Sequence, residues 1–172
     1  MATEQDRIVT AKPIWLPDLI TLDSFGGDWG RYFAVIYGCF QRDFVHSRPQ
    51  YKGTVLALKR HPVILGKEAT FWHLISEGNV EADRVPDMRR CERICWPRPI
   101  IENCDDEAVK TWENVRGRDK RILLWLPKYE YLVILSERNG YTLVWTAFTV
   151  TREHQKAKLQ REYEAFIKAK NG

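Results

Sequence analysis

The sequence lacks the features that mark membrane, secreted and low-complexity proteins. No apolar run approaches the roughly 20 residues needed to span a bilayer. The N-terminal stretch MATEQDRIVTAKP has no apolar core of the signal-peptide kind. The chain contains neither an internal repeat nor a low-complexity segment. These absences favour an intracellular, soluble protein, and we expect a cytoplasmic location and no membrane partner.

Several catalytic and cofactor motifs are also missing. The sequence has no GxxxxGK[ST] or GxGxxG phosphate loop, no HExxH pair and no GxSxG elbow. The acidic stretch Asp105-Asp106-Glu107 precedes AVKTWENV, and we interpret it as the start of a helix, where carboxylates are favoured by the helix dipole. We therefore expect no cofactor and no metal at this acidic stretch.

Cysteine is scarce, with four copies and no CxxC pair. In a chain of this size without an export signal, reduced thiols are the expected state. A zinc site formed by Cys91, Cys95, Cys104 and His73 is an alternative, although metal-site spacings are usually tighter. The sequence favours a fold that does not depend on metal.

The composition is that of a folded domain. Hydrophobic residues make up 44% of the chain, and Trp, Tyr and Phe each occur seven times, which excludes a disordered protein. The net charge of +4 permits a polyanionic partner without requiring one. We expect an irregular arm over residues 1–27, punctuated by prolines and glycines, and a single domain over residues 28–172.

Three helices are predicted in addition to the one expected after the acidic stretch. The first begins near Asp28, a good N-cap residue, and has aromatic residues at helical spacing before Arg48-Pro49 ends it. A short helix is predicted over Asp87 to Cys95, ended by Pro97 and Pro99. The last runs from about Thr151 to Lys170 and has one apolar stripe: Leu159, Tyr163, Phe166 and Ile167.

The remaining regular elements are predicted strands. Thr70 to Ile75 has the composition of a half-buried strand. Three β-rich runs follow later: Arg121 to Leu126, Tyr131 to Ser136 and Tyr141 to Val150. Asn139-Gly140 between the last two is a strong hairpin signal. The predicted fold class is α+β, with a central antiparallel sheet and N-terminal, middle and C-terminal helices.

His73 is the first candidate for chemistry, because it stands alone among apolar residues in TFWHLIS. One interpretation is a core histidine that bonds a backbone carbonyl. The other is a catalytic group, since imidazole is the side chain best suited to transfer protons near neutral pH. The residue type alone leaves both interpretations open.

Two further patterns offer candidate residues. The segment PDMRRCERICWPRP gathers Arg89, Arg90, Arg93 and Arg98, and guanidinium groups match phosphate oxygens in a bidentate way. The alternative is a solvated charged face. In YTLVWTAFTV, strand alternation places Thr146 on one face with Val144 and Phe148, although threonine is also favoured in strands for its shape alone. Trp72 is a candidate for stacking on bases.

Taken together, RHPVILGKEATFWHLISEG, PDMRRCERICWPRPIIEN and the hairpin ending in TAF before KLQREYEAF resemble a family of phage- and prophage-associated proteins. This family is grouped with the barnase–EndoU–colicin–RelE fold of toxin-like ribonucleases. The resemblance spans roughly Lys59 to Phe166. It implies an α+β fold whose central sheet carries the active site.

The resemblance also implies a metal-independent endoribonuclease, in which a ribose 2′-hydroxyl attacks the neighbouring phosphate to leave a 2′,3′-cyclic phosphate and a 5′-hydroxyl. It assigns acid–base catalysis to His73, phosphate stabilisation to Arg90 or Arg93, and a hydrogen bond to phosphate to Thr146. Lys67 is a further cation of this region. One departure is Phe148, a position where some relatives have tyrosine, because phenylalanine offers no hydroxyl.

Two functions of different classes follow. The first is a toxin-like endoribonuclease acting on tRNA or mRNA in a toxin–antitoxin, phage-defence or prophage setting, with an antitoxin or immunity protein as partner. Arg89, Arg98, Lys67 and Trp72 would then bind substrate. The second is a non-catalytic RNA- or protein-binding module that retains the fold and uses the arginine cluster and the basic C-terminal helix as its contact surface.

Overall fold

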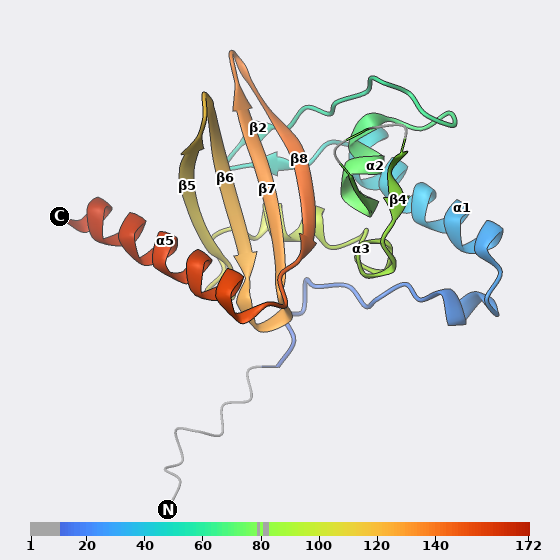
Figure 1. Cartoon of the computed structure of the whole chain (residues 1–172), viewed down its shortest axis with the longest axis horizontal. Coiled ribbons are helices and arrows are strands. Elements are labelled where there is room, and N and C mark those ends of the chain that lie inside the picture. Colours follow the sequence, from blue (N-terminus) through green and yellow to red (C-terminus); the bar gives the residue numbers. More distant parts are fainter. Residues whose placement is uncertain (1–10, 79, 81–82) are drawn as a thin grey trace, which may run out of the picture.

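The computed structural model describes residues 11–78, 80 and 83–172, and the chain there combines helices with one main sheet (Figure 1). The sheet is antiparallel and four-stranded, in the order β5-β6-β7-β8. Its strands are β5 (Lys110–Arg116), β6 (Asp119–Leu126), β7 (Tyr131–Arg138) and β8 (Tyr141–Thr149). The α+β class and the antiparallel sheet predicted from the sequence are confirmed.

The helices and minor elements surround this sheet. The helical segments are η2 (Leu22–Phe25), α1 (Trp29–Phe40), η3 (Gln41–Val45), α2 (Ala69–Ile75), α3 (Met88–Glu92), α4 (Pro97–Glu102), η5 (Pro127–Tyr129) and α5 (Glu153–Asn171). Two short hairpins pair β1 (Gln50–Tyr51) with β2 (Thr54–Val55), and β3 (Ser76–Glu77) with β4 (Val85–Pro86). None of the described helices is long and apolar enough to cross a membrane.

The helix predictions at the two ends of the domain are confirmed. Asp28 caps α1, its carboxylate accepting a hydrogen bond of 3.0 Å from the backbone N–H of Arg31. The π-helical turn η3 continues α1 to Val45. At the other end, α5 packs on the sheet through Leu159, with Tyr163 and Phe166 beside it.

Three local predictions are wrong. Thr70 to Ile75 is not a strand but lies in α2, and AVKTWENV is not helical but supplies β5. Pro97 and Pro99 do not end a helix; they lie in the first turn of α4, where a missing backbone N–H costs no hydrogen bond. The middle helix is shorter than predicted, and Asp87 is its N-cap.

A β-bulge changes the faces of β8. Ile134 pairs with Thr146, whereas Leu135 pairs with Val144, so Trp145 is an extra residue in β8. The strict alternation predicted for Tyr141 to Val150 is therefore wrong: Val144 joins the larger core, and Phe148 packs against the smaller one.

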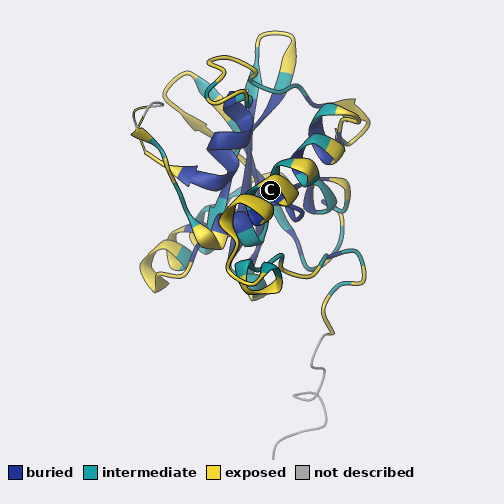
Figure 2. Cartoon of the chain, turned by 90° about the vertical axis from the view of Figure 1, so that its right-hand side faces the viewer, coloured by how far each residue is buried: buried dark blue, intermediate teal, exposed yellow. Residues whose placement is uncertain are grey.

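The two cores lie on opposite faces of the sheet. The larger one holds the buried residues of α1, α2 and α4 together with Leu124, Val133 and Leu135 of the sheet. The smaller one lies under α5 and includes Trp112 and Trp125. Figure 2 shows the buried residues in the interior and the exposed ones on outer turns and loops. Of the arm predicted over residues 1–27, residues 1–10 lie outside the described part, and Leu16 is buried in the larger core.

Candidate functional site

Helix α2 places His73 in the interior beside β8. Every residue of α2 is buried, which explains why its sequence has no amphipathic pattern: a helix surrounded by protein can be apolar all round. His73 is 4% exposed, and its ring meets that of Trp145 edge-on at a centroid distance of 5.1 Å. The imidazole is therefore packed against an aromatic ring rather than open to solvent.

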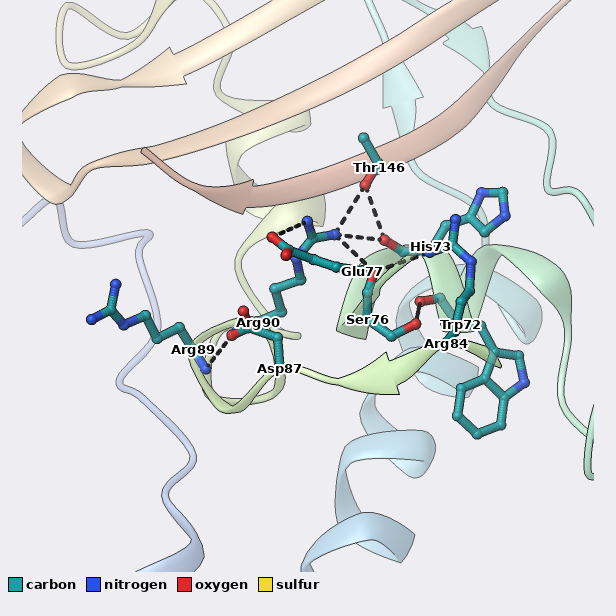
Figure 3. A network of polar contacts seen from close by, with 9 residues as sticks. All are labelled: Trp72, His73, Ser76, Glu77, Arg84, Asp87, Arg89, Arg90 and Thr146. Carbon is teal, nitrogen blue, oxygen red and sulfur yellow. Dashed lines mark hydrogen bonds and ion pairs between the residues drawn. The ribbon is translucent and has the colours of Figure 1, made fainter. Parts of the chain in front are cut away.

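Arg90 is the centre of a buried polar network (Figure 3). Its Nη1 donates to the main-chain oxygens of His73 at 3.2 Å and Ser76 at 3.1 Å, and to Oγ1 of Thr146 at 3.4 Å. Its Nη2 forms an ion pair with Glu77 at 3.1 Å. The guanidinium therefore satisfies carbonyl groups at the end of α2, where helix carbonyls lack partners and a cation is favoured.

Thr146 completes this network from β8. Its hydroxyl donates to the main-chain oxygen of His73 at 2.9 Å. The guanidinium carbon of Arg90 also lies 5.4 Å from the ring centroid of Phe148, within cation–π range. The sequence-predicted residues His73, Arg90 and Thr146 thus meet, but they meet at the backbone carbonyl of His73 and not at its imidazole.

The other predicted arginines lie elsewhere. Arg93 donates to the backbone oxygen of Arg89 at 2.9 Å, and its guanidinium lies 5.1 Å from the ring centroid of Trp96. Arg98 lies in α4 and donates to the main-chain oxygen of Asp43 at 2.8 Å. Neither has a contact with His73 among the described interactions.

Lys67 and Trp72 pack against aromatic residues of α1. The ammonium of Lys67 lies 5.2 Å from the ring centroid of Phe33 and 4.9 Å from that of Tyr37. Trp72 is 6% exposed, and its indole N–H donates to the backbone oxygen of Ile64 at 3.0 Å. Trp72 is thus a core residue, which leaves its face unavailable for stacking on a base.

An open cleft of about 790 Å³ is lined in part by Arg90 and by no residue of α2, and we call it the arginine cleft. Its lining includes Arg89 and Arg90 of α3, Phe148 and Thr149 of β8, and Thr151, Arg152 and Gln155 around the start of α5. Sequence reasoning missed Arg152 and Gln155. The only signal for them was the abundance of charged residues on the last helix.

In the arginine cleft, the carboxylates have partners within the described part of the protein, but two of the guanidinium groups have no ion-pair partner there. Its two carboxylates are engaged within the protein: Glu77 pairs with Arg90, and Asp87 accepts from the backbone N–H groups of Arg89 and Arg90. The guanidinium groups of Arg89 and Arg152 have no ion-pair partner within the described chain. Figure 3 shows the side chain of Arg89 extending away from the buried network. The lining therefore carries three guanidinium groups and two carboxylates, one net positive charge, and two of the guanidinium groups, those of Arg89 and Arg152, are open to an anion.

The zinc alternative finds no support in the geometry. Within residues 11–78, 80 and 83–172, no three His, Cys, Asp or Glu side chains are grouped so that they could hold a metal ion. Cys91 is buried, and burial raises the pKa of its thiol to about 12, which disfavours the thiolate that a metal would need. The four cysteines are free thiols.

The fold and the site define an α+β protein in which a buried arginine network adjoins a cationic cleft. Comparison with family models, curated proteins and solved structures finds no match to this chain.

Proposed function

We propose that this protein binds RNA in the arginine cleft without cleaving it. The observation that carries this proposal is the pairing of charges within the cleft. Glu77 forms an ion pair with Arg90, and Asp87 accepts hydrogen bonds from backbone N–H groups. The guanidinium groups of Arg89 and Arg152, in contrast, have no ion-pair partner within the described residues. Phosphate groups of a nucleic acid are anions that such unpaired guanidinium groups hold through bidentate hydrogen bonds.

The remaining lining supports a ribonucleotide chain. Thr149, Thr151 and Gln155 add neutral hydrogen-bonding groups to the cleft, suited to ribose hydroxyls and phosphate oxygens. Lys158 lies on α5 one turn beyond Gln155, so positive charge continues along that side of the helix. The contact surface is thus the arginine cleft together with the first turns of α5.

The test is binding of a fluorescently labelled single-stranded RNA, followed by anisotropy over a series of salt concentrations. The double variant Arg89→Gln/Arg152→Gln should bind at least about tenfold more weakly, and its salt dependence should fall by about two ion equivalents. The matched control is Arg31→Gln/Arg118→Gln, which removes two exposed arginines outside the cleft. Wild-type affinity in the first variant, or an equal loss in the control, would refute the proposal.

The metal-independent endoribonuclease predicted from the sequence is the second candidate. One observation favours it: His73, Arg90 and Thr146 come together from three distant segments, beside a cationic cleft. Two observations count against it, since the imidazole is 4% exposed and Arg90 already contacts four acceptors. An antitoxin or immunity protein belongs to this candidate alone.

The two candidates differ in a direct assay. Wild type and His73→Gln are incubated with total RNA in EDTA, and the ends of any product are analysed. RNA binding without cleavage leaves the RNA intact with both proteins. Fragments with 2′,3′-cyclic phosphate ends from wild type, absent with a folded His73→Gln variant, would establish the enzyme and overturn our first proposal.

A further inference from the structure

A second pocket, of about 240 Å³, lies between the outer face of the sheet and α5. We call it the sheet–helix pocket. Its wall is mainly aliphatic and consists of Leu123, Leu132, Ile134, Val150 and Leu159, with Phe148 at the side shared with the arginine cleft. Covering an apolar wall of this kind with an apolar group removes apolar surface from water, which is favourable.

The polar end of this pocket carries arginines from adjacent strands. Arg116 of β5 and Arg121 of β6 line it. Arg138 of β7 is near enough for its charge to act on Arg121, but it is paired with Asp119 at 2.7 Å. Neither Arg116 nor Arg121 has an ion-pair partner within the described residues. The pocket thus combines an aliphatic wall with two guanidinium groups that have no ion-pair partner among those residues, and Lys158 adds a third cation to its lining.

Arg121 is the least satisfied of these groups. Its Nε is buried and has no hydrogen-bond partner among the described atoms. Burial lowers the pKa of its guanidinium and the positive charge of Arg116 lowers it further, whereas the carboxylate of Asp119 opposes this shift. Buried donors are normally paired, so a buried guanidinium nitrogen that has no partner among the described atoms and lies near the positive charge of Arg116 indicates a place for an anion.

The one carboxylate of the lining does not serve Arg121. Oε2 of Glu162 accepts from the indole N–H of Trp112 at 3.4 Å and from the side-chain amide of Asn114 at 3.2 Å. Oδ1 of Asn114 is buried and has no partner of its own. Glu162 is thus engaged by neutral donors, and the arginines remain available to a ligand.

We propose that the sheet–helix pocket binds a monocarboxylate with an unbranched apolar chain, its carboxylate on Arg116 and Arg121 and its chain along the aliphatic wall. Guanidinium groups match the planar carboxylate in a bidentate way. A nucleotide fits less well, because Phe148 is the one aromatic ring of the lining and Arg90 lies over that ring. The pocket shares Phe148 and Gln155 with the arginine cleft, but Arg116 and Arg121 do not line that cleft, so this inference does not rest on the proposed RNA binding.

The experiment is calorimetric titration of the full-length protein with decanoate, decanol and acetate. Decanoate should bind, whereas decanol lacks the charge and acetate lacks the chain, so each should bind at least about tenfold more weakly. Arg121→Gln should weaken decanoate binding by a similar factor, and Arg116→Gln provides an independent second variant. Arg118→Gln, in the exposed turn between β5 and β6, is the matched control.

Each outcome decides the proposal. Tight decanoate binding that is lost in Arg121→Gln and Arg116→Gln but kept in Arg118→Gln supports it. The proposal is overturned if wild type does not bind decanoate, or if it binds decanol or acetate as tightly as decanoate. It is also overturned if both pocket variants keep the wild-type affinity for decanoate, or if Arg118→Gln loses as much affinity as they do. Circular dichroism spectra of the variants show that each remains folded, so a lost signal reports on the pocket.

Discussion

Thr146 and His73 are joined by a hydrogen bond of 2.9 Å between the hydroxyl of the first and the main-chain oxygen of the second, across 73 positions of sequence. Arg90 donates to the same oxygen at 3.2 Å. Three separate segments therefore converge on one carbonyl near the end of α2. This convergence fixes α2 against β8 and gives the buried arginine a structural role that needs no substrate.

Arg90→Ala should lower the free energy of unfolding by about 3 kcal/mol, because it leaves the buried carbonyls of His73 and Ser76 without their charged donor. Urea denaturation measures the change. Arg89→Ala removes the neighbouring arginine, which is exposed, and should alter stability by less than about 0.5 kcal/mol. Similar small effects in both variants would contradict the structural role of Arg90.

Thr146→Val should cost about 1 kcal/mol of stability, since valine keeps the shape of threonine but loses its hydrogen bond to His73. The loss should not add to that of Arg90→Ala, because both donors share one acceptor. A double-mutant cycle from urea denaturation measures the coupling, and Thr146→Ser serves as the control that keeps the hydroxyl. Strict additivity would show that the two donors act independently.

The sequence predicted the sheet and the terminal helices well, for a physical reason. The hairpin at Asn139-Gly140 needs a residue that tolerates positive φ, and Gly140 adopts a φ of 87°. Helix α5 has an exposed face, so its apolar stripe is visible in the sequence. Helix α2 has no exposed face; a short apolar run of this kind does not distinguish a buried helix from a buried strand.

The sequence indicated which segments contribute to the candidate site, but not how their residues contact one another. The family resemblance, rather than the residue types, grouped His73, Arg90 and Thr146, and the three lie in one hydrogen-bonded network. Their contact passes through a main-chain carbonyl, which no side-chain pattern reveals. The arginine cleft depends on Arg152 lying near α3, a tertiary relationship that spacing along the chain does not contain.

Leu159→Ala should lower stability by about 2 kcal/mol, because Leu159 is the buried residue through which α5 docks on the sheet. Hydrogen exchange should show faster exchange in α5 than in β6 and β7 of this variant. Lys158→Ala changes the adjacent exposed residue and should stay within about 0.5 kcal/mol of wild type. Equal exchange rates of α5 in the two variants would contradict this docking role.

Cys39 should be the first thiol to react with an alkylating reagent. A hydrogen bond from Cys95 lowers its pKa to about 7; burial opposes this shift, and the charge of Arg42 adds to it. Because the thiolate is the nucleophile, labelling of Cys39 by iodoacetamide should rise with pH and reach half its maximal rate near pH 7. Burial raises the pKa of Cys91 to about 12, so Cys91 should stay unlabelled over the same range.

Peptide mass spectrometry after short exposures at a series of pH values follows each thiol separately. Cys95→Ala removes the hydrogen-bond donor, so the midpoint for Cys39 should move to higher pH, toward that of an ordinary thiol. Cys104→Ala removes another buried cysteine that has no part in this contact, and it should leave the midpoint unchanged. A midpoint that stays near pH 7 in Cys95→Ala would show that the hydrogen bond is not what activates Cys39.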